Sequence, residues 1–193
     1  MQRAPHDHVS IYGDTLVLLW EDSAKLSVFS QQQMQDLFVE AFLKQYRISG
    51  TMNDLTDEEV EDSLIDYFAA YIQPRFGEGN KYKQYLLCAR YIGQICGFVF
   101  WDDLGDNQAY AAEVAIAPKY WHQGLGKIFM KSIFYRQPHT NKILLLTNHQ
   151  NKGAKQFYEA IGYQKSPYMH EGYSSEKFGA YELETDFETS VGS

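Results

Sequence analysis

The sequence predicts an α/β protein in which helices cover a mixed β-sheet. Segments with helical and strand-like spacing follow one another in the order β, α, α, β, β, β, α, β, α, β, β. Hydrophobic residues make up 45% of the chain, enough for a sizeable core. No internal repeat, low-complexity tract or linker interrupts the 193 residues, so we expect a single domain over 1–193.

The first part of the chain is expected to form strands and then two helices. Residues 9–20 predict one or two strands around a Gly-Asp turn. Ser30 can cap a helix that runs to about Tyr46, because the apolar positions between them follow helical spacing. The segment Thr56–Glu59 is a capping box for a second helix, and Pro74 is expected to end it.

The second part is richer in strands. The apolar run 143–146 is short and typical of a central strand buried on both faces. The elements expected here are, in order, a hairpin of strands 82–91 and 95–102, a strand over 108–117, a helix from 124 to about 135, the apolar strand, a helix over 151–161 closed by Gly162, and two strands within 163–184 around a long polar loop.

Composition limits the classes of partner. The net charge of −8 disfavours direct binding to nucleic acid, and solubility explains it more simply than a cationic partner does. No apolar run has the length of a membrane helix and the first residues do not form a signal peptide, so a cytoplasmic protein without membrane contact is expected. Cys88 and Cys96 are expected to be small buried residues on neighbouring strands.

The segment after Pro118 combines a strand end, a glycine-containing loop and a helix start. Gly124 and Gly126 let the backbone approach a ligand closely. The first amides of a helix lack internal partners, and with the helix dipole they form an anion site suited to a pyrophosphate, to which Lys127 adds a positive charge. Taken alone, the segment is weak evidence for a ligand, and a loop with two convenient glycines is the favoured explanation. The segment matches neither the Walker A code nor the dinucleotide fingerprint.

The helix that begins near Asn151 is the second segment of interest. Asn151 is well placed to cap the helix. Tyr158 shares one helix face with Ala154 and Ile161, so this segment alone favours a core aromatic residue over a functional one.

Together, four segments resemble the GNAT superfamily of acyltransferases, in the order and spacing of that family. They are Ile95-Cys96-Gly97-Phe98-Val99, Val114-Ala115-Ile116-Ala117-Pro118, Gln123-Gly124-Leu125-Gly126-Lys127 and the pattern Asn151…Ala154…Tyr158…Gly162-Tyr163. The resemblance covers about 86–163. It implies a GNAT-type mixed, mostly antiparallel central sheet flanked by about four helices, with the regions before and after shaping the acceptor site.

The resemblance also implies residue roles. Tyr158 would be catalytic, protonating the departing thiolate, and Asn151 would bond the pantetheine or phosphate region of acetyl-CoA. The remaining cofactor-binding residues would be Val114, Ala115 and Ile116 along the pantetheine arm, and His122, Gln123, Gly124, Leu125, Gly126 and Lys127 around the pyrophosphate. No metal is implied.

Two positions depart from the family pattern. Trp121 stands where the loop usually begins with Gln or Arg, so side-chain support of the loop must differ. Leu146 stands where many members carry an acidic base, so a base is not inherited there. Glu113 is the best candidate base, with a solvated strand carboxylate as the equal alternative, and His122 and His149 are weaker candidates.

The predicted function is N-acetylation of a primary amine by acetyl-CoA, with a small-molecule or protein acceptor and a homodimer as a possible assembly. The alternatives are a non-catalytic CoA-binding sensor or interaction module, and a transferase of a longer acyl group. One acidic cluster is expected to stabilise a helix start rather than attract a cationic substrate; it comprises Asp54, Asp57, Glu58, Glu59, Glu61, Asp62 and Asp66.

Overall fold

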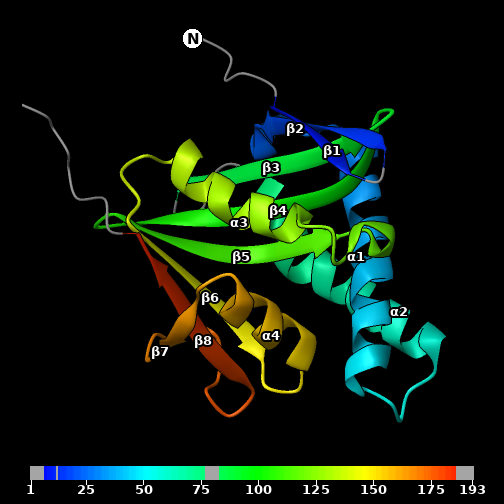
Figure 1. The fold of residues 1–193 in the computed structure, drawn as a ribbon. Coiled ribbons are helices and arrows are strands. Elements are labelled where there is room, and N and C mark those ends of the chain that lie inside the picture. The colour runs from blue at the N-terminus through cyan, green and yellow to red at the C-terminus, as the bar shows by residue number, and fades with distance from the viewer. Residues whose placement is uncertain (1–6, 12, 77–82, 186–193) are drawn as a thin grey trace, which may run out of the picture.

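A computed structural model describes residues 7–11, 13–76 and 83–185. Eight strands form one sheet in the order β1-β2-β3-β4-β5-β6-β8-β7 (Figure 1). Neighbouring strands are antiparallel except β5 and β6, which are parallel. The strands are β1 (Asp7–Ile11), β2 (Asp14–Glu21), β3 (Lys83–Tyr91), β4 (Gln94–Gly105), β5 (Gln108–Ile116), β6 (Lys142–Asn148), β7 (Gln164–Ser166) and β8 (Phe178–Glu184).

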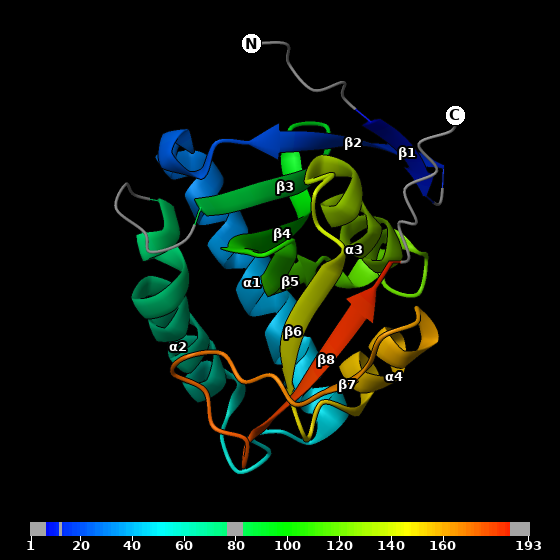
Figure 2. The same cartoon turned by 90° about the vertical axis from the view of Figure 1, so that its left-hand side faces the viewer.

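Four α-helices cover the two faces of this sheet. They are α1 (Val28–Ser49), α2 (Asp57–Tyr67), α3 (Leu125–Arg136) and α4 (Lys152–Ala160). Figure 2 shows α1 and α2 on one side of the sheet and α3 and α4 on the other. The predicted fold class, a mixed and mostly antiparallel sheet with about four helices, is therefore confirmed.

The first helix begins earlier than the sequence predicts. The cap is Ser27 and not Ser30, because the Ser27 hydroxyl accepts a hydrogen bond from the Ser30 backbone N–H at 3.1 Å. The first-turn residues Val28 and Phe29 are 81% and 67% exposed. The helix start therefore lacks the buried apolar positions that would have marked it in the sequence.

The second helix begins as predicted. The Thr56 hydroxyl accepts from the Glu59 backbone N–H at 3.3 Å, and a Glu59 carboxylate oxygen accepts from the Thr56 N–H at 2.8 Å. The acidic side chains of the first turn therefore serve the helix start. Pro74 does not end the helical path, since a π turn (Phe68–Ile72) and a 3-10 turn (Gln73–Phe76) extend it.

Strands β3 and β4 form the predicted hairpin, although residue 82 of the expected first strand lies outside the described residues. Its two-residue turn places Ile92 and Gly93 at φ 48° and 78°, the left-handed conformation that such turns require. Cys88 and Cys96 lie on these strands with free thiols and are 0% and 5% exposed, as predicted for small core residues.

Strands β5 and β6 diverge, and this opening positions the site. Their pairing runs from Gln108↔Lys142 to Ala111↔Leu145 and stops there. Beyond that point β6 continues to pair only with β8, up to Asn148↔Phe178. Figure 1 shows the two strands separating from a common origin, with α4 on the far side of the opening. Among the described residues, the end of β5, Val114–Ile116, therefore has no paired strand on the side of the opening.

Candidate active site

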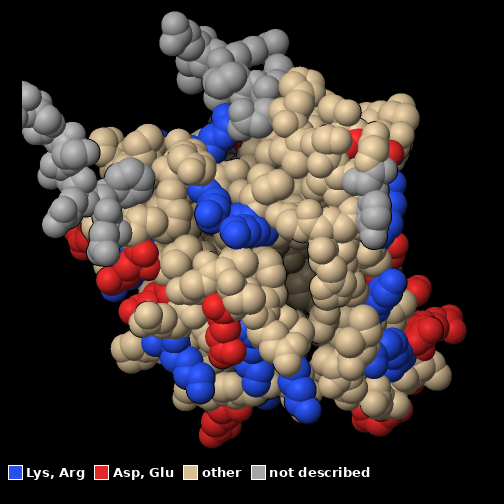
Figure 3. Space-filling view, viewed as in Figure 1, with Lys and Arg blue, Asp and Glu red and all other residues tan. Residues whose placement is uncertain are grey.

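The opening between β5 and β6 is visible as a hollow in the molecular surface (Figure 3). It lies between the positions of β5 and α4 in Figure 1, beside the start of α3. Val114 and Ile116 are half-buried and Ala115 is 2% exposed. This edge is where the sequence places the cofactor-binding residues Val114, Ala115 and Ile116.

The loop before α3 is shaped by left-handed residues. His122 has φ 60°, and Gly124, the residue before the first helical turn, has φ 90°. At Gly124 a side chain would be strained by this backbone conformation. The loop turns the chain so that α3 begins at Leu125, and the backbone amides of its first turn have no partner within the helix.

Trp121 supports this loop in the place of the polar residue that the family usually has. Its indole N–H donates to the Ile116 carbonyl at 2.6 Å, so one lone pair of that carbonyl is already engaged. The Lys44 ammonium of α1 lies over the Trp121 ring, 5.5 Å from the ring centroid. The Gln123 side chain donates to the Lys119 carbonyl. Trp121 and Gln123 therefore hold the loop between the end of β5 and α3.

Gly126 lets α3 and α4 approach each other. A Cβ atom at this position would lie 2.8 Å from the Phe157 ring of α4 and 3.3 Å from Ile116 Cδ1 of β5. Gly126 is thus needed for the close approach of three elements that border the hollow, which is a second reason for its presence besides ligand binding.

Asn151 caps α4, as expected from the sequence. Its side-chain oxygen accepts from the Ala154 backbone N–H at 2.9 Å and from Gln45 Nε2 of α1 at 2.8 Å. The Gln45 contact ties α1 to α4. The Asn151 oxygen is occupied by these two bonds, so a bond to a cofactor would come from its amide nitrogen.

Tyr158 is half-buried in an aromatic cluster. Its ring lies 5.2 Å from that of Phe157, 5.6 Å from Tyr163 and 6.3 Å from Tyr181. The Tyr158 ring therefore packs against both Phe157 and Tyr163. Within the described part of the chain its hydroxyl has no hydrogen-bond partner. Burial, and secondarily the charge of Glu113, raise the pKa of Tyr158, so the hydroxyl stays protonated at neutral pH.

Glu113 lies on β5 with its side chain on the α1–α2 side of the sheet. Its carboxylate accepts a hydrogen bond from the Tyr67 hydroxyl of α2 at 2.8 Å. Burial raises the pKa of Glu113 to about 7, although the Tyr67 hydrogen bond and the Arg75 charge act in the opposite direction. A half-buried carboxyl that titrates near neutrality has the property of a general base, which the solvated alternative lacks.

Several residues around Glu113 had no signal in the sequence. Arg75 pairs with the buried Asp102 at 2.8 Å, and the Tyr110 ring stacks on His170 at 4.1 Å between centroids. The Tyr173 hydroxyl lies 3.5 Å from that of Tyr67. These side chains come from four separate segments and form no local motif, so the count of fifteen tyrosines was the one hint in the sequence.

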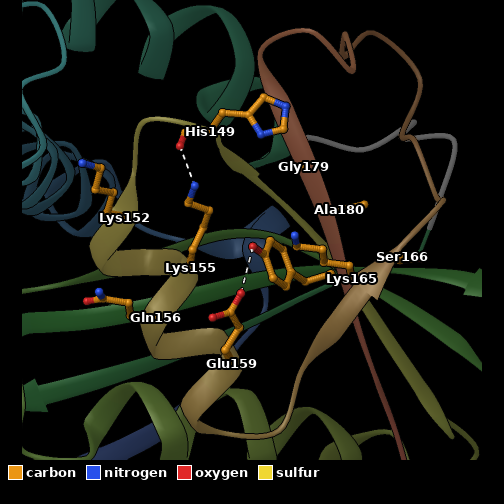
Figure 4. A pocket seen from close by; sticks show the side chains of 10 residues that line it. His149, Lys152, Lys155, Gln156, Glu159, Lys165, Ser166, Gly179 and Ala180 are labelled. Atoms are coloured by element: carbon orange, nitrogen blue, oxygen red, sulfur yellow. Dashed lines mark hydrogen bonds between the residues drawn. The ribbon is translucent and has the colours of Figure 1, made fainter.

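The two histidines considered as bases lie in loops, one before α3 and one between β6 and α4. His122 is exposed in the loop before α3. His149 borders a groove of about 450 Å³ between α4, β7 and β8, where its Nε2 lies 3.0 Å from the Ser175 carbonyl. Figure 4 shows this groove with Lys155 directed at the His149 carbonyl, a hydrogen bond of 2.7 Å. Glu113 and Tyr158 do not line it.

A family model described as an acetyltransferase (GNAT) domain matches residues 82–165. The match spans the hairpin, the divergent strands, the loop before α3 and α4, which are the elements that border the hollow. Residues 82–165 are therefore a GNAT-type acetyltransferase segment. Acyl transfer is therefore the class of chemistry to which this fold belongs.

Solved GNAT structures share the architecture at low sequence identity. The PaiA N-acetyltransferase from Thermoplasma acidophilum, in complex with coenzyme A, is 14% identical, with a TM-score of 0.67 over 87% of this chain and 99% of that one. The GNAT domain of S. lividans PAT is 13% identical, with a TM-score of 0.59 over 93% of this chain and 97% of that one. No curated protein sequence matches the chain.

Two further properties concern the described residues. None of their helices is both long and apolar enough to cross a membrane. In the same ranges, no group of three or more His, Cys, Asp or Glu side chains is arranged to hold a metal ion.

Proposed function

We propose that the protein transfers an acetyl group from acetyl-CoA to a primary amine. The observation that supports this most is that Glu113 and Tyr158 come from β5 and α4, two elements that border one opening, and that the Glu113 carboxylate is hydrogen-bonded to Tyr67 at 2.8 Å. One group is suited to accept a proton near neutral pH and the other to donate one. An acyl transfer to an amine needs both.

The residues present fit coenzyme A. The unpaired edge of Val114–Ile116 offers backbone groups to a pantetheine amide chain. The start of α3 at Gly124 offers free amides to a pyrophosphate, and Lys127, which is exposed, adds charge. The amide nitrogen of Asn151 and the backbone from His122 to Gly126 complete the proposed binding residues.

The chain's own residues supply the proton transfers. Acetyl-CoA supplies an acyl group activated as a thioester. An alkylammonium has a pKa near ~10.4, so the amine must lose a proton before it can attack. Glu113 accepts that proton, directly or through a water molecule. Tyr158 donates its proton to the sulfur as the C–S bond breaks, and a backbone amide near Ala115 stabilises the charge on the carbonyl oxygen. The nitrogen loses its second proton as the amide forms, and this proton restores the Tyr158 hydroxyl, directly or through water.

Acetyl, rather than a longer acyl group, is supported by Phe98 and Phe100 of β4. Both are 0% exposed, and they pair with Ala115 and Glu113 of β5. The Phe100 ring packs on Phe76 at 5.6 Å between centroids. We propose that these packed rings limit the length of the acyl chain.

Free-thiol release tests the proposal. Purified protein is incubated with acetyl-CoA or a longer acyl-CoA and a panel of small amines, polyamines, lysine peptides and N-terminal peptides. We expect acceptor-dependent release from acetyl-CoA with at least one amine, and a large loss at pH 7 in Glu113→Gln. Binding of CoA without release from any acceptor would favour the sensor alternative. Faster release from a longer acyl-CoA would contradict the acetyl assignment.

A further inference from the structure

The Glu113 carboxylate is held by a residue of another element. The Tyr67 hydroxyl donates to Glu113 Oε1 at 2.8 Å and also lies 3.5 Å from the Tyr173 hydroxyl. Among the described residues, Tyr67 is the group that hydrogen-bonds the Glu113 side chain. One carboxylate oxygen is therefore engaged, and the second, Oε2, is left to accept a proton.

Aromatic packing fixes the position of this hydroxyl. The Tyr67 ring stacks on Phe38 of α1, with 5.9 Å between centroids and 5° between planes. Phe38 is 1% exposed and belongs to the core, so it is itself immobilised by packing. The Tyr71 ring also packs on the Tyr67 ring, with 4.9 Å between centroids. The hydroxyl thus has a defined place before any ligand arrives.

The other polar groups around Glu113 have different partners or no bond to it. The Arg75 guanidinium of the 3-10 turn donates to both carboxylate oxygens of Asp102 of β4, at 2.8 and 3.1 Å. Gln84 of β3 donates to the same carboxylate at 3.0 Å. Four phenols also sense the Glu113 charge: Tyr46 of α1, Tyr110 of β5, Tyr158 of α4 and Tyr173 of the β7–β8 loop.

We propose that Tyr67 is a positioning residue for Glu113, which fixes the orientation of the carboxylate and favours its ionised form, so that Oε2 can take the proton of the acceptor amine. The inference rests on the proposed function of Glu113 as the base. Tyr67 lies outside the segment 82–165 that matches the family model, so this device comes from a part of the chain that the match does not cover.

The first test is direct and needs no acceptor. The Glu113 carboxyl is titrated by NMR in protein labelled with ¹³C at glutamate carboxyl groups, and is assigned by its loss in Glu113→Gln. In wild type it should titrate with a pKa of about 7. In Tyr67→Phe the pKa should rise by about one unit, because a hydrogen bond to the charged form is lost. The matched control is Tyr71→Phe, which removes a hydroxyl from an adjacent side chain that is 65% exposed and should leave the titration unchanged.

The second test is the pH dependence of turnover. Because the base must be ionised, kcat/KM rises with pH through the pKa of Glu113. In Tyr67→Phe this rise should move up by about one pH unit, a loss of about tenfold below pH 7 that nearly disappears at pH 9. CoA affinity should stay unchanged. Phenylalanine keeps the ring that stacks on Phe38, so the melting temperature should stay close to that of wild type.

The outcomes separate the two proposals. A Tyr67→Phe titration within a few tenths of a unit of wild type, or a kinetic profile that does not move, overturns the role of Tyr67. A Glu113→Gln variant with full turnover and an unchanged profile overturns Glu113 as the base, whatever Tyr67 does. If the NMR titration shifts as expected while the kinetic profile stays in place, Tyr67 tunes the carboxyl without serving catalysis, and the positioning role is rejected.

Discussion

Burial of Glu113 makes its ionised form unfavourable, and the same burial suits the carboxyl to act as a general base. A carboxyl in water ionises near its reference pKa of 4.5, whereas burial raises the pKa of Glu113 in the folded protein to about 7. Around neutral pH the residue therefore exchanges protons readily, as a general base requires. The same property makes the ionised form unfavourable for the folded state.

This cost predicts a pH dependence of stability. Between pH 4.5 and about 7 the folded protein keeps the Glu113 proton that the unfolded chain has lost, so the free energy of unfolding falls as the pH rises through this window. Glu113→Gln removes the titration. We expect the variant to be more stable than wild type at pH 8 by about 1–3 kcal/mol, and close to wild type at pH 4. Urea unfolding at both pH values measures this. A difference that is the same at pH 4 and pH 8 would contradict the raised pKa.

Tyr158 is the second residue for which we propose a proton transfer. Tyr158→Phe deletes the hydroxyl and keeps the ring that packs on Phe157, Tyr163 and Tyr181. A positioned proton donor contributes roughly 10²–10⁴-fold, and we expect a loss of this size in kcat. Affinity for acetyl-CoA should hardly change, because the lost interaction matters mainly in the transition state.

The measurement for Tyr158 therefore compares kcat and acetyl-CoA affinity in the same preparation. Tyr163→Phe is the matched control, since it also removes a phenol hydroxyl from this cluster. Wild-type turnover in Tyr158→Phe would assign the residue to packing. A joint loss of affinity and turnover would mean that the hydroxyl binds the cofactor.

At the scale of elements, the sequence was informative wherever local chemistry decides the structure. The capping box at Thr56, the cap at Asn151 and the two-residue turn at Gly93 all appear where the sequence places them. The predicted start of α1 was wrong because Ser27 and Ser30 are both good caps, and because the exposed Val28 and Phe29 gave no periodic pattern. The extension beyond Pro74 was missed because a 3-10 turn can include a proline in its first residues.

The divergence of β5 and β6 could not be derived from the periodicity of either strand. Each has the apolar pattern of a paired strand, and pairing is determined by contacts with β4 and β8. The loop support by Trp121 was equally out of reach, because its bond to Ile116 depends on the turn at His122. The resemblance in motifs predicts where the site lies, and the structure shows how the elements that carry these motifs are arranged.

At the scale of the whole molecule, residues far apart in the sequence meet around Glu113. Tyr67 and Arg75 precede the matched segment 82–165, and His170 and Tyr173 follow it. Figure 2 shows the β7–β8 loop beside α2, which brings the two flanking regions together. The expectation that the flanking regions shape the acceptor side stays a prediction. Tyr67 and Tyr173 are the tyrosines through which these regions would act.

The central claim is that coenzyme A binds in the opening between β5 and β6, at the start of α3. Its most direct test is thermal stabilisation by CoA and acetyl-CoA in wild type, Gly124→Val and Gly105→Val. Gly105 is the matched control, because its φ of 79° is close to the 90° of Gly124 and an added Cβ would have open surroundings at both positions. It lies in the β4–β5 turn, far from the opening.

At a ligand concentration of one hundred times the dissociation constant, the account predicts that wild type and Gly105→Val are each stabilised by ~2.7 kcal/mol, whereas Gly124→Val shows no shift. An unchanged melting temperature of wild type with both ligands, or a full shift in Gly124→Val, would contradict it.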